Sequence, residues 1–199
     1  MKKGRQSLAP GFLIASPPLG DPNFDRTVVL LAVHNEDGAL GFVINRPAPM
    51  SLGEVLNLAG YRGPETNDRG VVFLGGPVSP SMGWILCRDP SLEAEQEGVL
   101  VVDDRIRVTS RRSAFDDLVH DRNALAGEVD PKRRFVVLGY SGWGPGQLEK
   151  EISAGAWMPS ALDEGVLFDV DVEQRWERAY ALIGLSPLVM MSMRGGGEA

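Results

Sequence analysis

The 199-residue sequence contains a single cysteine, Cys87. One cysteine excludes a disulfide within the chain and any zinc site built on a CxxC or Cys/His framework. It also agrees with a reducing compartment, where thiols stay free. We expect neither a metal site nor a cofactor, and, together with the missing secretory and membrane-spanning segments described next, we predict a cytoplasmic protein.

Long apolar stretches are missing as well. At the N-terminus a few basic residues precede an apolar run that covers only residues 12–15, because Pro10 and Gly11 interrupt it. A secretory signal needs an apolar core of roughly 7–15 residues. No apolar run approaches the roughly 18 residues of a membrane-spanning helix. The sequence therefore predicts no secretion and no membrane partner.

The common catalytic and nucleotide-binding motifs do not occur. The sequence has no GxSxG, HExxH, EF-hand loop or GxxxxGK[ST]. The remaining nucleophile and bases are Cys87, His34 and His120. Cys87 lies in an apolar strand pattern, where a free cysteine usually behaves as a small buried hydrophobe. We therefore predict no catalytic residues and a protein that binds and does not catalyse a reaction, with an enzyme as the alternative.

Positive charge is in deficit. The chain has 20 Lys and Arg against 27 Asp and Glu, a net charge of −7 and a pI near 4.9. Such a field opposes non-specific binding to nucleic acids. Two basic clusters could form a local patch, but charges at strands and turns usually face water; they comprise Arg105, Arg107, Arg111, Arg112, Lys132, Arg133 and Arg134. We expect no strong direct nucleic-acid binding.

Strand signals dominate what is present. Residues 26–34 are apolar and β-branched in the middle, which predicts a strand buried on both faces. A turn at residues 35–38 leads to a partner strand at residues 40–44, and this hairpin should form the centre of a sheet. Further strands are expected at residues 71–74, 84–87, 99–102, 105–108, 135–138 and 166–168. The alternation of arginine and apolar residues in 105–108 predicts one face in water.

Helix signals are short and irregularly placed. Ser51 and Glu54 have the spacing of a capping box, and Gly60 suits the end of that helix. Further helices are expected after Ser113, at residues 145–153 with Gly144 as a possible N-cap, and from Asp171 to Gly184. The last should bury Val172, Trp176, Tyr180 and Ile183. This arrangement predicts an α+β fold with a mostly antiparallel or mixed sheet, in a single domain of residues 8–187 between flexible ends, 1–7 and 188–199.

Several blocks of sequence resemble the AlgH/YqgE family of bacterial proteins. They are GFLIASP from Gly11, GALGFVINRP from Gly38, FLGGPV from Phe73, GYSGW from Gly139 and GQLEKEI from Gly146. The resemblance implies a cytosolic protein with a compact α+β fold around a partly barrel-like sheet. Members are often described as transcriptional regulators. The family offers no agreed reaction, cofactor or catalytic set to transfer to these residues.

Seven residues are candidates for ligand binding, grouped by the turns that carry them. They are Asn45, Arg46, Gly75, Gly76, Trp143, Gln147 and Glu149. An arginine fork suits a carboxylate or phosphate, and paired glycines let a ligand approach backbone. Each group also has a purely structural interpretation as a turn or strand exit. The segment 139–151 is expected to form a structural loop and helix cap or to contact a neutral or cationic ligand through Glu149, since its carboxylates disfavour phosphate.

These observations favour a non-enzymatic binding or regulatory module that works through a protein or small-molecule partner. The alternative is an enzyme or ligand-binding protein that acts on a small polar or anionic metabolite. The absence of an assembled catalytic signature supports the first, and the candidate residues above would carry the second.

Overall fold

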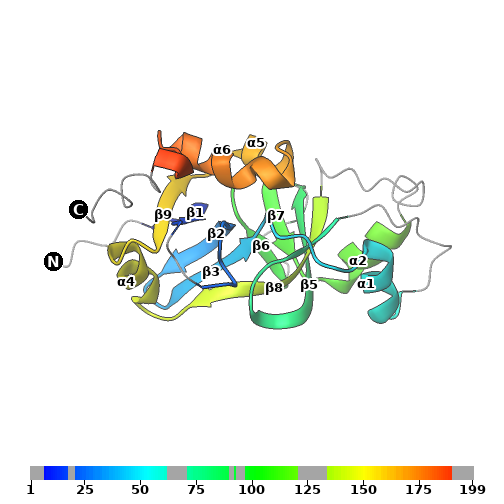
Figure 1. Ribbon diagram of the computed structural model, residues 1–199. Coiled ribbons are helices and arrows are strands. Elements are labelled where there is room, and N and C mark those ends of the chain that lie inside the picture. The colour runs from blue at the N-terminus through cyan, green and yellow to red at the C-terminus, as the bar shows by residue number, and fades with distance from the viewer. Residues whose placement is uncertain are drawn as a thin grey trace, which may run out of the picture. The chain divides into compact units, whose positions relative to one another are not determined.

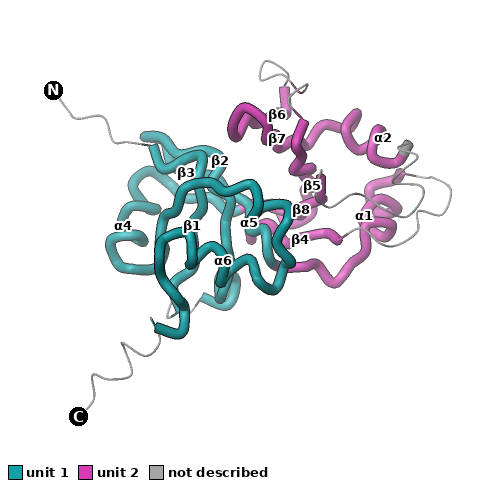
Figure 2. Tube along the Cα trace, turned by 90° about the horizontal axis from the view of Figure 1, so that it is seen from above, with its two compact units in different colours: residues 1–45, 141–199 teal, residues 46–140 magenta. Residues whose placement is uncertain are grey.

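The structure is a computed structural model that describes residues 7–17, 21–61, 71–89, 92, 97–120 and 134–189. The chain forms two compact units, coloured separately in Figure 2: unit 1 comprises residues 1–45 and 141–199, and unit 2 comprises residues 46–140. The predicted flexible ends lie almost wholly outside the described residues. The predicted α+β class is confirmed, with a mostly antiparallel sheet curled into a half-barrel and several short helices. That residues 8–187 unfold as one domain stays a prediction.

The sheet of unit 1 is built around the predicted hairpin. Strands β2 (Val28–Asn35) and β3 (Gly38–Val43) pair antiparallel, and Val28 to Ala32 are buried as expected. Strand β1 (Gly11–Ala15) pairs with β2, and β9 (Trp157–Ala161) pairs with β1. The last residues of β8 (Arg134–Trp143) pair with β3. Strands β1 and β9 were not predicted; β9 contains Pro159, which a strand tolerates at the edge of a sheet.

Two predictions for the helices of unit 1 are wrong. The predicted strand at residues 166–168 belongs to helix α5 (Glu164–Phe168), because the Asp163 side chain accepts a hydrogen bond from the Val166 amide and caps a helix there. Asp171 does not cap the last helix. It precedes a 3-10 turn (Val172–Gln174), and helix α6 (Arg175–Leu182) then begins behind Gln174. Three apolar residues are too few for periodicity to separate a strand from a helix.

Helix α6 packs on strands β1, β2 and β9 of unit 1 (Figure 1). Its buried face holds Trp176 and Tyr180, as predicted, whereas Val172 and Ile183 are only half-buried. The Trp176 indole and the Tyr180 hydroxyl both donate to the Ala15 carbonyl, at 3.0 and 3.2 Å. The buried polar atoms of these two rings are therefore paired with the backbone of β1.

The strands of unit 2 carry two helices. The strand order is β6 (Val99–Val101), β7 (Ile106–Thr109), β5 (Val78–Arg88), β8 and β4 (Val72–Leu74), and only the β4–β8 pair is parallel. Helices α1 (Leu52–Leu58) and α2 (Arg112–His120) pack together against these strands (Figure 1). Among the helices in the described ranges, none is long and apolar enough to cross a membrane.

The prediction of a wet face on residues 105–108 holds for Arg105, which is exposed, but is wrong for Arg107. Arg107 lies in β7, whose four residues are all buried, and is only 8% exposed. Its guanidinium donates to the carbonyl oxygens of Leu92 at 2.8 Å and Ile106 at 3.1 Å, and to that of Asp103. A buried arginine is acceptable when its donors are satisfied, so alternation of arginine with apolar residues did not indicate solvent exposure at Arg107.

Candidate functional site

Two of the candidate residues, Trp143 and Gln147, meet in unit 1 around a carboxylate that was not a candidate. The Glu151 side chain accepts hydrogen bonds from the Trp143 and Trp157 indoles at 2.8 Å each, and from the Gln147 amide at 2.9 Å. Trp143 and Trp157 are buried, with ring centroids 5.9 Å apart. Glu151 thus satisfies the indole donors at the edge of the core, which is a structural role.

The turn before helix α4 (Gln147–Ser153) differs slightly from the prediction. The helix begins after Gly146, which has a positive φ of 71°, and not after Gly144. As predicted, the Gln147 side chain contacts the backbone that precedes the helix: its side-chain oxygen accepts a hydrogen bond from the Gly144 amide at 3.1 Å. Leu148 is buried beside Trp143, also as predicted. The Gly144 amide is therefore already paired and is not offered to a ligand.

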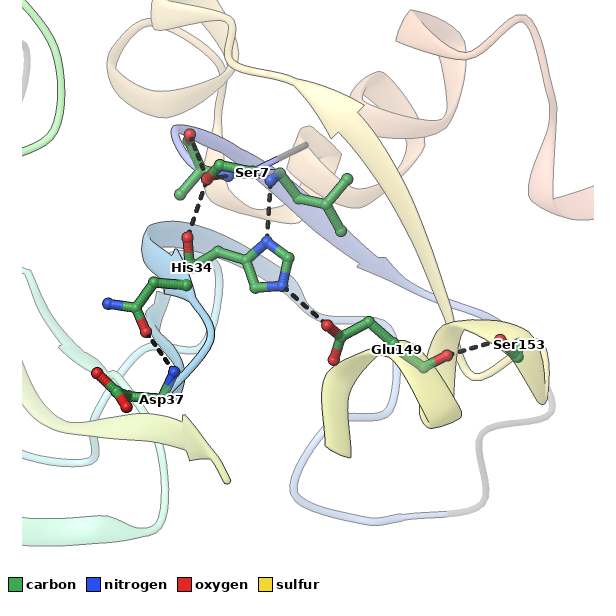
Figure 3. A network of polar contacts seen from close by, with 8 residues as sticks. Ser7, His34, Asp37, Glu149 and Ser153 are labelled. Carbon is green, nitrogen blue, oxygen red and sulfur yellow. Dashed lines mark hydrogen bonds and ion pairs between the residues drawn. The ribbon is translucent and has the colours of Figure 1, made fainter. Parts of the chain in front are cut away.

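The side chains of Glu149 and His34 face each other in unit 1 (Figure 3). The Glu149 Oε1 and His34 Nε2 atoms are 3.6 Å apart, and the His34 side chain is only 6% exposed. The other ring nitrogen, Nδ1, accepts a hydrogen bond from the Leu8 amide at 3.0 Å. Both nitrogens are thus directed at the protein itself, so neither has the free approach to a substrate that a general base needs.

Asn45 and Arg46 are neighbours in the sequence but belong to different units, Asn45 to unit 1 and Arg46 to unit 2. In unit 1, the Asn45 side chain accepts from the Val28 amide at 2.8 Å and donates to the Arg26 carbonyl at 2.9 Å. It therefore ties the end of β3 to the start of β2, which agrees with the turn interpretation. In unit 2, Arg46 is half-buried and its carbonyl accepts from the Leu74 amide at 2.8 Å. A ligand-binding role for either residue stays a prediction.

Gly75 and Gly76 make a close backbone crossing in unit 2. The Gly75 amide donates to the Leu138 carbonyl at 2.7 Å, and a Cβ atom on Gly75 would lie 2.5 Å from the Gly139 carbonyl oxygen. Gly76 has a positive φ of 152°. The two glycines therefore allow another segment of the same chain to approach their backbone closely. This supports the structural interpretation of Gly75 and Gly76 as a tight turn at the end of a strand.

Cys87 is buried in β5, and burial raises the pKa of its thiol to about 12; Asp89 adds to this rise, while Arg134 and Arg107 oppose it. Because only the thiolate reacts, we expect iodoacetamide at pH 8 to alkylate the native protein about a thousandfold more slowly than the urea-unfolded protein. Mass spectrometry over time measures both rates. Equal alkylation rates for the native and the unfolded protein would contradict the burial and the raised pKa of the Cys87 thiol.

Unit 2 also contains a pocket of about 550 Å³ that none of the sequence candidates lines. Its wall comes from the end of α1, the residues after it, the middle of β5 and the start of α2. The apolar part includes Leu56, Leu58, Met82 and Phe115. Leu58 and Met82 are 79% and 38% exposed, so apolar side chains at the opening face solvent. A volume of this size suits a small organic ligand.

A helix end builds one side of this unit 2 pocket. The capping box of α1 is confirmed, with the Ser51 amide donating to Glu54 at 2.8 Å. At the other end, the Gly60 amide bonds to the Asn57 carbonyl and the Tyr61 amide to the Leu56 carbonyl. This is a Schellman motif, made possible by the positive φ of 81° at Gly60. It turns the chain back so that Tyr61 lines the pocket.

A bulge in β5 builds another part of the pocket wall. On β5 the pairing with β8 jumps from Val78 to Gly83, while on β8 it moves only from Tyr140 to Leu138. The extra residues leave the ladder, so Pro80, Ser81 and Met82 are exposed and line the pocket. Strand bulges commonly re-aim side chains in this way near sites.

Apart from Ser81 on the β5 bulge, the polar groups of the pocket lie at or near the start of α2. Ser110, Arg112 and the Tyr61 hydroxyl lie among its lining residues, and Arg112 alone of the described lining residues carries a charge. The guanidinium lies over the Tyr61 ring, 5.2 Å from its centroid. Burial raises the pKa of Tyr61, the Arg112 charge opposes this rise and Asp116 adds to it, so the phenol is neutral at physiological pH.

The comparisons with known proteins agree with the resemblance seen in the sequence. The AlgH-like family model matches residues 12–188. A UPF0301 protein from Anaeromyxobacter sp. strain Fw109-5 is 43% identical over 198 residues, which cover 96% of each chain. A UPF0301 protein from Caulobacter vibrioides is 38% identical over 176 residues, 87% of this chain and 86% of that one.

Solved structures extend the likeness to the fold. The solution structure of the AlgH protein from Pseudomonas aeruginosa is 31% identical in sequence and has a TM-score of 0.73, with 100% of this chain and 98% of that chain covered. A crystal structure of a Corynebacterium diphtheriae protein, 18% identical, shares the fold alone, with a TM-score of 0.63 over 90% of this chain and 88% of that one. The chain belongs to the AlgH-like family.

Proposed function

We propose that this protein is a non-enzymatic binding module whose ligand is a small molecule with a large apolar part, held in the unit 2 pocket. The observation that carries the proposal is the pocket itself: a concave volume of about 550 Å³ with a mostly apolar wall and a few polar groups. Ligand sites in proteins commonly have this composition. The concavity favours a small molecule over a flat protein surface.

The chemistry of the titratable groups supports binding over catalysis. Cys87 is buried with a raised thiol pKa, and both ring nitrogens of His34 are directed at protein atoms. A nucleophile needs an activating base within hydrogen-bond reach and access to a substrate. The groups described here have neither, so we assign no reaction to them.

The environment-sensitive dye N-phenyl-1-naphthylamine tests the proposal, because it is apolar, uncharged and fluorescent only out of water. We expect saturable fluorescence enhancement with a Kd in the micromolar range. Leu58→Asn should weaken binding about fivefold, since it replaces apolar wall by a polar amide at an exposed position.

Leu182→Asn is the matched control for this experiment. Leu182, like Leu58, is the last residue of its helix and is exposed, at 42%, but it lies in unit 1. Binding of the dye should be unchanged in this variant. Absence of saturable binding to the wild type, or equal weakening by both substitutions, would refute the unit 2 pocket as the site.

A direct action on DNA is not part of the proposal. The net charge is −7, and one of the basic residues of the predicted clusters, Arg107, is buried; Lys132 and Arg133 lie outside the described residues. We expect labelled duplexes titrated by fluorescence anisotropy at near-physiological salt to bind with a Kd above about 1 μM and without sequence preference. A tighter complex that prefers one sequence would contradict this.

A further inference from the structure

We infer that the ligand of the unit 2 pocket is an amphiphilic anion, an apolar chain or ring system with one carboxylate, whose charged end lies against Arg112 at the start of α2. The inference rests on the proposed function and adds the ligand's class and orientation. It follows from how charge is distributed around the pocket.

Positive charge is concentrated at one end of the pocket. Arg112 is the first residue of α2, and Ser110 precedes the helix by two residues; both line the pocket. The first turn of α2 contains no acidic residue, which leaves the positive end of the helix dipole favourable to an anion, while the Asp116 charge acts on Tyr61 and opposes this in part. Asp116 and Asp117 follow in the second turn but do not line the pocket. A carboxylate at this end therefore meets a cation, a hydroxyl and a favourable dipole.

Arg112 is also held in a suitable position. Its guanidinium lies over the Tyr61 ring, and the Tyr61 hydroxyl donates to the Arg112 carbonyl at 3.4 Å. Tyr61 in turn is placed by the Schellman motif at the end of α1. A guanidinium that stacks on a ring keeps its planar edge for a carboxylate, which it can bind with two hydrogen bonds.

The rest of the pocket does not offer a second site for charge. Apart from Ser81, the remaining lining residues are apolar side chains or Gly83, among them Phe115, Met82, Val55 and Leu56. An ion placed among these side chains would lose its hydration without a partner, which is costly. The apolar part of the ligand therefore occupies this wall, and the carboxylate has one favourable orientation.

The test compares decanoate with decanol, each below its aggregation concentration, as competitors of bound N-phenyl-1-naphthylamine. The two differ in the charge of the head group. We expect Arg112→Gln to weaken decanoate about 5- to 10-fold and to leave decanol and the dye within about twofold. Raising NaCl from about 50 to 500 mM should weaken decanoate only.

Arg178→Gln is the matched control, since Arg178 is an exposed helical arginine of unit 1. It should change neither competitor. Equal effects of Arg112→Gln on decanoate and decanol, or none on either, would overturn the inference while the dye still binds. If the dye itself fails to bind, the proposed function fails and the inference falls with it. Because Arg112 is exposed, its replacement leaves the core intact.

Discussion

Replacing Trp176 by alanine is expected to lower the free energy of unfolding by about 3–5 kcal/mol. The indole is 7% exposed, packs against Tyr180 with ring centroids 5.1 Å apart, and donates to the Ala15 carbonyl at 3.0 Å. The substitution leaves a cavity between α6 and β1 and removes a buried hydrogen bond. Urea unfolding followed by far-UV circular dichroism measures the change, because that signal does not depend on the lost tryptophan.

Leu182→Ala on the same helix is the control for this substitution. Leu182 is 42% exposed, so its truncation should cost no more than about 0.5 kcal/mol. If Trp176→Ala also lowered the free energy of unfolding by no more than about 0.5 kcal/mol, helix α6 would not contribute to the core of unit 1.

Gly139→Ala is expected to cost about 2–5 kcal/mol in unit 2, from two causes. Gly139 has a φ of 69°, where an alanine side chain is strained by roughly 1–2 kcal/mol. The new Cβ atom would also lie 2.6 Å from the Gly76 carbonyl oxygen and 2.9 Å from that of Val78. Both contacts are with backbone, so the chain at the β5 bulge must shift, at a further cost of about 1–3 kcal/mol.

Gly60→Ala separates these two causes. Gly60 has a similar φ of 81°, but nothing lies within 4 Å of its added Cβ atom. It should therefore lose only the conformational part, about 1–2 kcal/mol. Equal losses at Gly60 and Gly139 would show that the backbone crossing is looser than described.

These two large effects also test whether the units unfold together. Trp176 belongs to unit 1 and Gly139 to unit 2. If residues 8–187 form one cooperative domain, each substitution shifts a single transition as a whole. A variant with two separate transitions, of which only one has moved, would contradict the one-domain prediction.

The parts of the fold that could be predicted have their signals within a short stretch of sequence. The β2–β3 hairpin follows from a continuous apolar run and an adjacent turn, and the capping box of α1 needs only Ser51 and Glu54. Strand β9 could not be predicted, because Pro159 argues against a strand until its edge position is known. Helix α5 was missed because three apolar residues carry no period.

The pocket could not be predicted for a related reason. Its wall combines a helix end near Tyr61, the β5 bulge and the start of α2, which are brought together only by the pairing of distant strands. Gly60 marked the turn that places Tyr61, but Arg112 was grouped with surface charges. The candidate residues Trp143 and Gln147 do lie together, but both donate side-chain hydrogen bonds to Glu151 within unit 1.

The most direct test of the proposed function is an amide ¹H–¹⁵N correlation spectrum of the whole protein titrated with N-phenyl-1-naphthylamine. Because the dye is uncharged, this measurement tests the pocket independently of the head group. We expect shift changes at Leu58, Met82 and Phe115, which line the unit 2 pocket, and none at Trp143 or Trp157 in unit 1. Saturable changes confined to unit 1, or no saturable changes, would contradict the proposal.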